Sequence, residues 1–393
     1  MKRTLLFLTA AVAMLACGSC AEKKAIAGHI EGLEGDSLSI KVYAFNNRRE
    51  PVQELVVPMK DGAFEVAFED TTIRNIVLGV PGDPRFVEGF ERILYVPGEN
   101  MVLSGTVDSV VCSGSQYYKD KQAFDDCCKA ERAQVASLTN DYRAAMAKNQ
   151  EDPSIEKIVD KIDSVQACIV DKTYEFAKAR PSNVFTASIV GSLIGEDGAK
   201  ALEVLDLLSD DVKEGYMKPM LEQVRTSAER AKAISEAAEK VKDGMPAPDF
   251  TLKNPAGEDF TLSSIFNQKK YIILDFWGTW CYWCVKGIPD MKKLYSDAKG
   301  RIEIVGIDCG ESEEKWKDGI EKHQLPWLHV YNPGGDNDLS VKYAIKGYPT
   351  KIILNPDGTI NRTVIGEDPE FYTYVRELIK TAPPIDIRAI VSR

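Results

Sequence analysis

Two cysteines, Cys281 and Cys284, stand three residues apart in the stretch FWGTWCYWCVKGIP at residues 276–289. Three tryptophans flank or separate them, and Pro289 follows five residues after the second cysteine. Two thiols at this spacing suit a redox pair that closes and opens a disulfide. They equally suit half of a metal site or a part of the hydrophobic core. The elements around the pair decide between these chemistries.

The residues around the pair predict a strand followed by a helix. YIILDFW (271–277) is a nearly continuous apolar run, typical of a strand buried on both faces, and a helical pattern runs from about Tyr282 to Ala298. Cys281 then lies at a helix N-terminus, where unpaired N–H groups and the helix dipole favour a thiolate. We expect Cys281 to attack a partner disulfide and Cys284, one turn further on, to resolve the mixed disulfide.

Two prolines also fit the prediction of a redox site around Cys281 and Cys284. Pro289 lies inside the predicted helix and should kink it, because it removes a hydrogen bond and clashes with the preceding turn. Pro349 stands in KGYPT, directly before a predicted strand. A cis bond is inexpensive only before proline. A cis Tyr348–Pro349 bond would expose the Tyr348 backbone beside the thiols.

The pair lies in an α/β region at residues 245–381. FTL, YIILDFW, RIEIVGID and TKIILNP are strand-like, and helical stretches follow the second and third of them. TKIILNPDGTINRTVIG predicts a hairpin around Asp357-Gly358, and EFYTYVRELIKT predicts a last helix. This order predicts an α/β layer with a mixed central sheet.

The preceding half of the chain predicts two further regions. Residues 25–112 show five to seven short strands, as in a small all-β sandwich or barrel, with a hairpin around Lys60-Asp61-Gly62. Residues 117–242 are helical, with breaks at Pro153 and Pro181 and a long solvated last helix that closes at Gly244. The chain is therefore predicted to be multi-domain, with a tail at residues 382–393.

The net charge and the N-terminal segment limit the classes of function that fit this chain. The 393 residues carry 49 Lys and Arg against 60 Asp and Glu, a net charge of −11, which argues against nucleic acid binding. The start, MKRTLLFLTAAVAMLACGSC (1–20), predicts a secretory signal. Its apolar run is too short to span a membrane, and no later segment is apolar enough. Outside the cytoplasm the nine cysteines meet oxidants.

Residues 245–381 resemble the thioredoxin-fold domain of the TlpA/ResA-like thiol–disulfide oxidoreductases. The matching motifs are PAPDFTL, LDFWGTWCYWC, Pro289, VGID and GYPTKIILNPDGTI. The domain order also resembles a group of envelope lipoproteins in which a β domain and a helical linker precede this fold. MLAC, ending at Cys17, resembles a lipobox, with Cys20 as the alternative lipidated residue and plain signal cleavage as another.

The resemblance implies a role for each matching residue. Cys281 is the expected attacking cysteine, Cys284 the resolving one and Pro349 the cis-proline. Asp275 matches a buried acid that helps to move the proton of the second cysteine, and burial on a strand would raise its pKa. Family members often carry a glutamate three residues after the second cysteine; here that residue is Gly287, which leaves Asp275 to act alone.

The aromatic residues at the site have two interpretations. For Trp277 and Trp280, packing around the thiols is favoured over binding a cofactor, while Trp283 lies in the exposed loop between the thiols, where it can touch the partner. With Tyr348, the residues Trp280, Tyr282 and Trp283 form the predicted substrate-binding set. The Tyr282-Trp283 dipeptide lacks the proline or histidine of better-known members, and this dipeptide influences the redox potential.

The resemblance thus implies a reductase of disulfides in other envelope proteins. The signal and the lipobox-like motif predict a place in the periplasm or cell envelope, with a lipid anchor as the only attachment to the membrane. The resemblance implies an electron supply from a membrane reductase of the DsbD type and no organic cofactor. Oxidation or isomerisation of disulfides is the alternative direction. A binding protein whose N-terminal half carries the main role is another alternative.

Two other chemistries fit less well. A structural zinc site usually needs four ligands, but the chain has one CxxC and only three histidines, of which His323 and His329 lie six apart. A peroxiredoxin would need a proline at residue 274, which is leucine.

The remaining cysteines are interpreted as structural. Cys128 and Cys168 lie on apolar helix faces, which favours packing in the core, and Cys127 adjoins one. A disulfide among Cys112, Cys127, Cys128 and Cys168 is the alternative. Cys309 follows the strand RIEIVGID, at the sheet edge expected for Cys281. A loop cysteine is the favoured interpretation there, and a third redox thiol the alternative.

Overall fold

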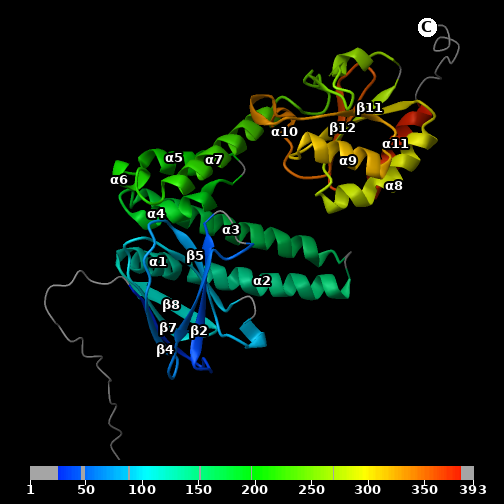
Figure 1. The fold of residues 1–393 in the computed structure, drawn as a ribbon. Coiled ribbons are helices and arrows are strands. Elements are labelled where there is room, and N and C mark those ends of the chain that lie inside the picture. Colours follow the sequence, from blue (N-terminus) through cyan, green and yellow to red (C-terminus); the bar gives the residue numbers. More distant parts are fainter. Residues whose placement is uncertain are drawn as a thin grey trace, which may run out of the picture. The chain divides into compact units, whose positions relative to one another are not determined.

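A computed structural model describes residues 25–45, 49–86, 89–149, 152–195, 197–268 and 270–381 (Figure 1). The predicted signal, Cys17, Cys20 and the tail at 382–393 lie outside these ranges. The chain divides into two compact units, one of residues 1–189 with 207–221 and one of residues 190–206 with 222–393. The domain boundaries expected from the sequence stay a prediction.

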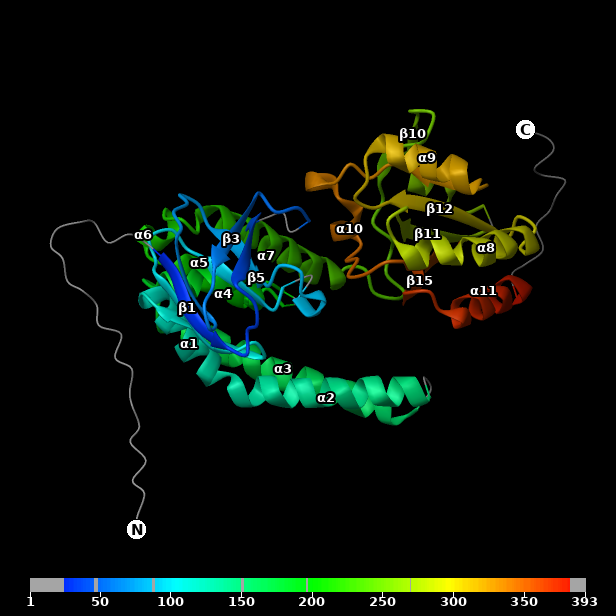
Figure 2. The same ribbon diagram turned by 60° about the horizontal axis from the view of Figure 1, so that its bottom comes forward.

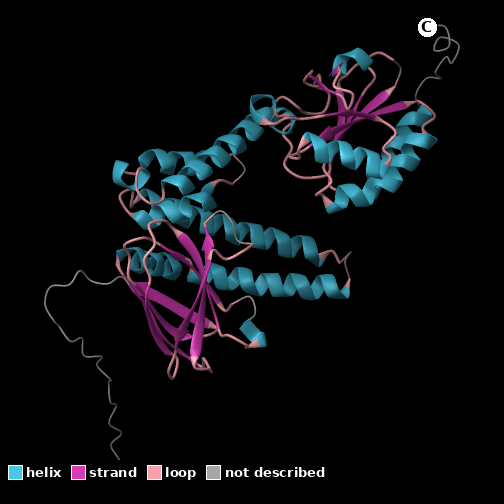
Figure 3. Ribbon diagram, in the orientation of Figure 1, coloured by secondary structure: helices cyan, strands magenta, loops and turns pink. Residues whose placement is uncertain are grey.

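The first unit begins with a sheet-rich region, as expected. Two four-stranded sheets have the strand orders β4-β1-β7-β8 and β3-β2-β5-β6. Figure 3 draws the strands in magenta. The alternating apolar residues of β2, such as Ile40, are fully buried, and β5 is buried along an unbroken run around Ile76. The described residues contain eight strands here rather than five to seven: β1 (Ala25–Glu31), β2 (Ser37–Ala44), β3 (Gln53–Pro58), β4 (Ala63–Ala67), β5 (Arg74–Gly79), β6 (Glu91–Tyr95), β7 (Met101–Thr106) and β8 (Ser109–Gly114).

The predicted hairpin at Lys60-Asp61-Gly62 is half right. The turn forms, with mutual backbone hydrogen bonds of 2.9 Å between Lys60 and Ala63, and with Asp61 and Gly62 at positive φ. The strands on its two sides nevertheless join different sheets, because β3 pairs with β2 and β4 pairs with β1. The turn therefore carries the chain from one sheet to the other.

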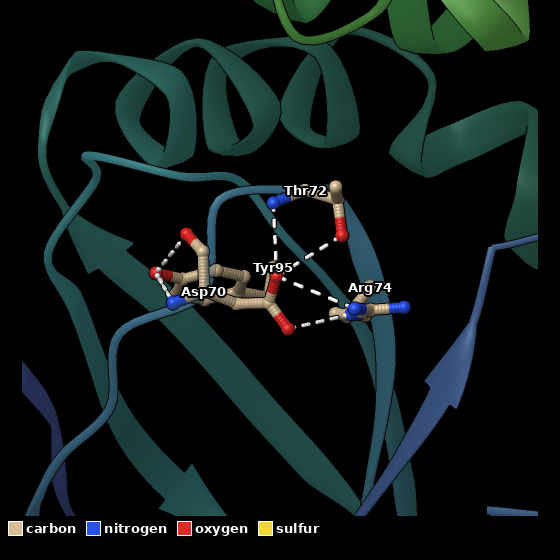
Figure 4. Close-up of polar contacts among 4 residues, drawn as sticks. All are labelled: Asp70, Thr72, Arg74 and Tyr95. Carbon is tan, nitrogen blue, oxygen red and sulfur yellow. Dashed lines mark hydrogen bonds and ion pairs between the residues drawn. The ribbon is translucent and has the colours of Figure 1, made fainter. Parts of the chain in front are cut away.

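The return from β4 to β5 is tied by the Asp70 carboxylate, as Figure 4 shows. It accepts hydrogen bonds from the Thr72 N–H at 2.9 Å and from Arg74 Nε at 2.7 Å. The Asp70 N–H in turn donates to the hydroxyl of Tyr95 on β6, at 3.2 Å. An Asx-type turn and an ion pair thus fix the connection from β4 back to the sheet that contains β5.

Helices fill the middle of the chain, as predicted. Pro153 precedes α3, and Pro181 separates α3 from α4, so both proline breaks are confirmed. Helices α2 and α3 lie side by side as a long hairpin (Figure 2). The helices are α1 (Gln116–Cys127), α2 (Lys129–Lys148), α3 (Ser154–Lys178), α4 (Val184–Ile189), α5 (Ala199–Leu207), α6 (Asp210–Lys213) and α7 (Lys218–Ala238), with short 3-10 turns at η1 (Pro84–Phe86) and η2 (Val190–Leu193).

The last of these helices ends earlier than predicted. It stops at Ala238 and not at Gly244. The segment after it is held instead by the β14–β15 hairpin, because the Gly244 N–H donates to Ile360 O at 2.7 Å and the Ala247 N–H donates to Gly358 O at 2.9 Å. These tertiary hydrogen bonds replace those that one more helical turn would make.

The second unit contains the predicted mixed sheet, in the order β13-β12-β11-β14-β15. β11 is parallel to β12 and antiparallel to β14, and the Asp357-Gly358 hairpin joins β14 to β15 as expected. The elements are β9 (Thr251–Lys253), β10 (Asp259–Thr261), η3 (Leu262–Ile265), β11 (Tyr271–Trp277), α8 (Tyr282–Asp297), β12 (Ile302–Asp308), α9 (Glu313–His323), β13 (Leu328–Val330), η4 (Gly335–Asn337), α10 (Leu339–Lys342), β14 (Thr350–Leu354), β15 (Ile360–Ile365) and α11 (Pro369–Thr381).

The sheet carries a separate core on each face. Side chains of α8, α9 and α11 pack on one face, together with Cys281 and Cys284. Residues of α10, η3 and the segment around Phe250 pack on the other face. β11 is buried on both faces, in agreement with its unbroken apolar sequence.

Candidate active site

Cys281 and Cys284 form a disulfide in this structure, with an S–S distance of 2.09 Å. Cys281 is the N-cap of α8, and its sulfur accepts a hydrogen bond from the Cys284 N–H at 3.1 Å. The predicted strand–thiol–helix order is therefore confirmed. An anionic sulfur at this position faces the free N–H groups of the first helical turn, which favours the thiolate of the reduced state. The helix runs on through Pro289.

The disulfide is buried beneath exposed aromatic side chains. The cysteines are 5% and 7% exposed, whereas Trp280, Tyr282 and Trp283 are 52% to 69% exposed. Trp280 meets the ring of Tyr348 edge to face at 5.3 Å, and its indole N–H donates to Cys309 O at 2.8 Å. The four residues of the predicted substrate-binding set thus border the disulfide, while Trp277 lies in the core below it.

Asp275 lies on β11, two residues before Trp277, and is 8% exposed. Burial raises the pKa of its carboxyl group to about 6; Lys351 lowers this pKa and Glu367 raises it. The raised pKa expected from the sequence is therefore found. A carboxylate with such a pKa accepts a proton near neutral pH and returns it readily.

The Tyr348–Pro349 bond is cis, as predicted. Pro349 lines a small cavity together with Asp275, Cys284, Lys351 and Glu367. The volume of this cavity, about 10 Å³, is at the lower limit for one water molecule. The acid, the second cysteine and the cis-proline are thus brought to one place from three different elements.

The expectation that Asp275 acts alone stays a prediction, but the structure places a second carboxylate near Cys284. A side chain at Gly287 would start 2.5 Å from the carboxyl carbon of Glu367, so the Glu367 carboxylate occupies the place beside α8. Glu367 lies before α11 and forms an ion pair with Lys351 on β14, at 2.8 Å. A lysine in the apolar strand TKIIL was the one sequence signal for this pair.

The other described cysteines are free. Cys112 and Cys128 are buried, so the core prediction holds for Cys128. It is wrong for Cys168, which is exposed because its part of α3 faces solvent; Cys127 is exposed as well. Cys309 follows β12 in a loop but is 2% exposed, and burial raises its pKa to about 12. Such a thiol is a poor nucleophile, which disfavours the third-redox-thiol interpretation.

No group of three or more His, Cys, Asp and Glu side chains is placed to hold a metal ion within the ranges that the structure describes. His329 is buried, and burial lowers its pKa to about 3. Among the described helices, none is both long and apolar enough to cross a bilayer.

The fold and the dithiol site define a thioredoxin-like enzyme of thiol–disulfide exchange. The family model described as thioredoxin-like matches residues 268–360. The thiol-disulfide oxidoreductases ResA of Bacillus cereus (strain ZK / E33L) and Bacillus subtilis (strain 168) are both 30% identical to this chain. These alignments span 130 and 135 residues, which are 33% and 34% of this chain and 73% of each relative.

The chain belongs to the ResA/TlpA-type thiol–disulfide oxidoreductases. A solved structure of a thiol-disulfide oxidoreductase from Bacteroides fragilis NCTC 9343 is 29% identical. It covers 34% of this chain and 98% of its own, with a TM-score of 0.31.

Proposed function

We propose that this enzyme reduces disulfides in other proteins of the cell envelope. The observation that carries the proposal is the Cys281–Cys284 disulfide at the N-terminus of α8, with the buried carboxyl group of Asp275 on the strand beneath it. The ResA-type relatives support thiol–disulfide exchange as the reaction. The resemblance to that family supports reduction as its direction.

The proposed cycle begins with the reduced dithiol. The Cys281 thiolate attacks one sulfur of a substrate disulfide, and the other substrate sulfur leaves as a thiolate. Cys284 gives its proton to Asp275 and attacks Cys281 Sγ, which breaks the bond to the substrate and releases its second thiolate. Two electrons pass to the substrate, and the enzyme is left with the disulfide seen in this structure.

An enzyme oxidised in each cycle needs a source of electrons. We infer a membrane reductase of the DsbD type as this source, since two electrons must reach an exported protein. The predicted secretory signal and the lipobox-like MLAC support a place in the periplasm or cell envelope, with Cys17 as the lipidated residue. We assign residues 25–242 a role in location, dimerisation or choice of partner.

The aromatic residues around the disulfide suit a protein substrate. Tyr282 and Trp283 are exposed directly beside the buried thiols, and Trp280 and Tyr348 form an edge-to-face pair next to them. Exposed aromatic side chains supply contact area at a small cost in conformational entropy. We propose that these four side chains contact the polypeptide on both sides of the substrate cysteine.

Trapping tests the proposal. The Cys284→Ser variant, reduced and mixed with envelope extract, is expected to hold substrates as mixed disulfides on Cys281, which mass spectrometry identifies. The Cys281→Ser variant is the matched control and should trap only the background held by the exposed Cys127 and Cys168. Reduction of a model disulfide protein should require both cysteines. Equal capture by both variants, or capture that survives dithiothreitol, would refute the redox function and favour the binding alternative.

A further inference from the structure

Gly287 leaves room beside Cys284 for a carboxylate from a distant part of the chain. A Cβ atom at residue 287 would lie 2.5 Å from the carboxyl carbon of Glu367 and 2.7 Å from its Oε1, closer than real Cβ contacts allow. Gly287 is buried on α8, one turn after Cys284, whereas Glu367 precedes α11. The Glu367 carboxylate therefore fills the space that a side chain at residue 287 would take.

The Glu367 carboxylate is held from two sides. Its Oε2 accepts from Lys351 Nζ at 2.8 Å, and its Oε1 accepts from the Tyr372 hydroxyl. The side chains of Lys351 and Glu367 are only 3% and 13% exposed, and the Lys351 ammonium lies 5.5 Å from the centre of the Phe371 ring. A buried ion pair is costly to maintain and is weak evidence for stability, so its presence calls for another reason.

The position of Lys351 supplies this reason. Lys351 stands directly opposite Asp275 in the β11–β14 pairing, and side chains at opposed positions project from the same face of a sheet. Cys284 packs on that face as well. Asp275, Cys284, Lys351 and Glu367 all line the cavity of about 10 Å³. The titratable side chains that face Asp275 from the packed elements are Cys284, Lys351, Glu367 and Tyr372.

We propose that Lys351 and Glu367 are positioning residues that set the charge of Asp275 and thereby the rate at which Cys284 resolves the mixed disulfide. Lys351 favours the Asp275 carboxylate, and Glu367 opposes it, both directly and by drawing the Lys351 charge to itself. Because the two charges cancel as a pair, Asp275 stays a base that Cys284 can use. This inference rests on the proposed function, of which it specifies one step.

The step in question is the second half of the cycle. The Cys284 thiol passes its proton to the Asp275 carboxylate, directly or through one water molecule in the cavity. The Cys284 thiolate then forms a bond to Cys281 Sγ, and the substrate thiolate leaves with the electron pair of the broken bond. Neither Lys351 nor Glu367 exchanges a bond or an electron in this step.

Stopped-flow kinetics isolate this step in the full-length reduced protein. Dithiobis-nitrobenzoate, an aromatic disulfide, releases one coloured thiolate when Cys281 attacks it and a second when Cys284 resolves the mixed disulfide. The Cys284→Ser variant supplies the background from Cys281 and from the exposed Cys127 and Cys168. The pH at which the second phase reaches half of its maximal rate is the quantity compared.

The two single variants are expected to shift this midpoint in opposite directions. Glu367→Gln removes a charge that disfavours the Asp275 carboxylate, so the midpoint should fall by about one pH unit. Lys351→Met removes a charge that favours it, so the midpoint should rise by about one pH unit. The double variant removes both charges together and should return close to the wild-type midpoint. Glu370→Gln is the matched control. It removes the same charge from an exposed side chain three residues after Glu367, so the midpoint should not change.

A relocation variant tests the place of the carboxylate itself. Glu367→Ala empties the space beside α8, and adding Gly287→Asp returns a carboxyl group one bond beyond the Cβ position that Glu367 now blocks. The Glu367→Ala midpoint should fall, and the Gly287→Asp, Glu367→Ala midpoint should recover at least half of the shift. Recovery by a substitution on α8, a different element from the segment that carries Glu367, would not follow from a loss of packing.

Unchanged midpoints in both Glu367→Gln and Lys351→Met would overturn the inference. Shifts of both midpoints in the same direction would also overturn it, because they would indicate a general loss of packing around Asp275. Either result would leave the proposed function standing, provided that the wild-type second phase exceeds the Cys284→Ser background. A wild-type protein with no second phase would instead overturn the proposed function. If Lys351→Met fails to fold, the Glu367→Gln, double and relocation variants still decide the outcome.

Discussion

Asp275 is costly to the fold, and the proposed cycle gives this cost a use in the reaction. Its carboxyl group is buried on β11, and no hydrogen bond or ion pair to it is found among the described residues. Burial without a partner penalises the charged form, so the pKa rises to about 6 from an ordinary value of 3.8. The folded protein therefore holds this proton more tightly than the unfolded chain does.

The Asp275→Asn variant should reveal this cost in the pH dependence of stability. Because the folded pKa exceeds the unfolded one, wild-type stability falls as pH rises from about 4 through about 6 and is level above. The variant lacks this fall. The free energy of unfolding of the variant minus that of the wild type should therefore rise by roughly 2 kcal/mol between pH 4 and pH 7.

Urea unfolding of the oxidised protein measures this difference. All five tryptophans lie between residues 277 and 327, so their fluorescence follows the thioredoxin-like region alone. A difference that is constant from pH 4 to pH 7 would mean that Asp275 keeps an ordinary pKa, and its proposed part in proton transfer would lose its basis.

At the residue scale, the sequence motifs identified the residues around the disulfide but not the Glu367 carboxylate that lies beside them. Cys281, Cys284, Asp275 and Pro349 were all found from motifs that are contiguous or nearly so. Glu367 was missed because its relation to Gly287 exists only after α11 packs against α8. The sequence shows that α8 has glycine where relatives often have a glutamate. It does not show that Glu367, from another part of the chain, places a carboxylate there.

Among the elements, the turn between β3 and β4 shows the limit of local patterns. Turn chemistry depends on a few adjacent residues, and Lys60-Asp61-Gly62 forms the turn that its sequence predicts. Which strand pairs with which depends on residues far along the chain, so β3 and β4 join different sheets. The helix end predicted at Gly244 was wrong for the same reason, since β15 takes up the segment.

Gly62→Ala should destabilise the sheet-rich region. Gly62 has a φ of +78°, which costs a Cβ-bearing residue about 1–2 kcal/mol, and its Cβ would clash with the carbonyl oxygen of Ile30 on β1. Gly82→Ala is the matched control, because Gly82 has a φ of +79° but nothing within 4 Å of a Cβ. Thermal unfolding followed by far-ultraviolet circular dichroism should show a larger loss for Gly62→Ala; equal losses would mean that backbone strain alone matters.

At the scale of the whole molecule, the relatives cover one third of the chain, and the rest is assigned by composition and layout. The sheet-rich and helical regions followed from strand and helix periodicity, although the number of strands was too low. No motif in residues 25–242 carries a reaction. The role that we propose for them depends on surfaces and partners, which a single sequence does not encode in recognisable short patterns.

The predicted anchor belongs to this scale. In a bacterial host that processes lipoproteins, the full chain should partition into the detergent phase, and mass spectrometry should find lipid on Cys17. Cys17→Ser should release the protein into the aqueous phase, while Cys20→Ser should not. Lipid on Cys20, or partitioning unchanged in Cys17→Ser, would contradict the lipobox assignment.

The most direct test of the central claim is the reduction potential of the Cys281–Cys284 couple. It is measured by equilibration in glutathione or dithiothreitol buffers, with fluorescence of Trp280 and Trp283 beside the thiols as the signal. A reductase requires a potential below about −250 mV, in the range of reducing dithiols. A potential above about −180 mV, in the range of isomerases and oxidases, would contradict the proposed direction of electron flow.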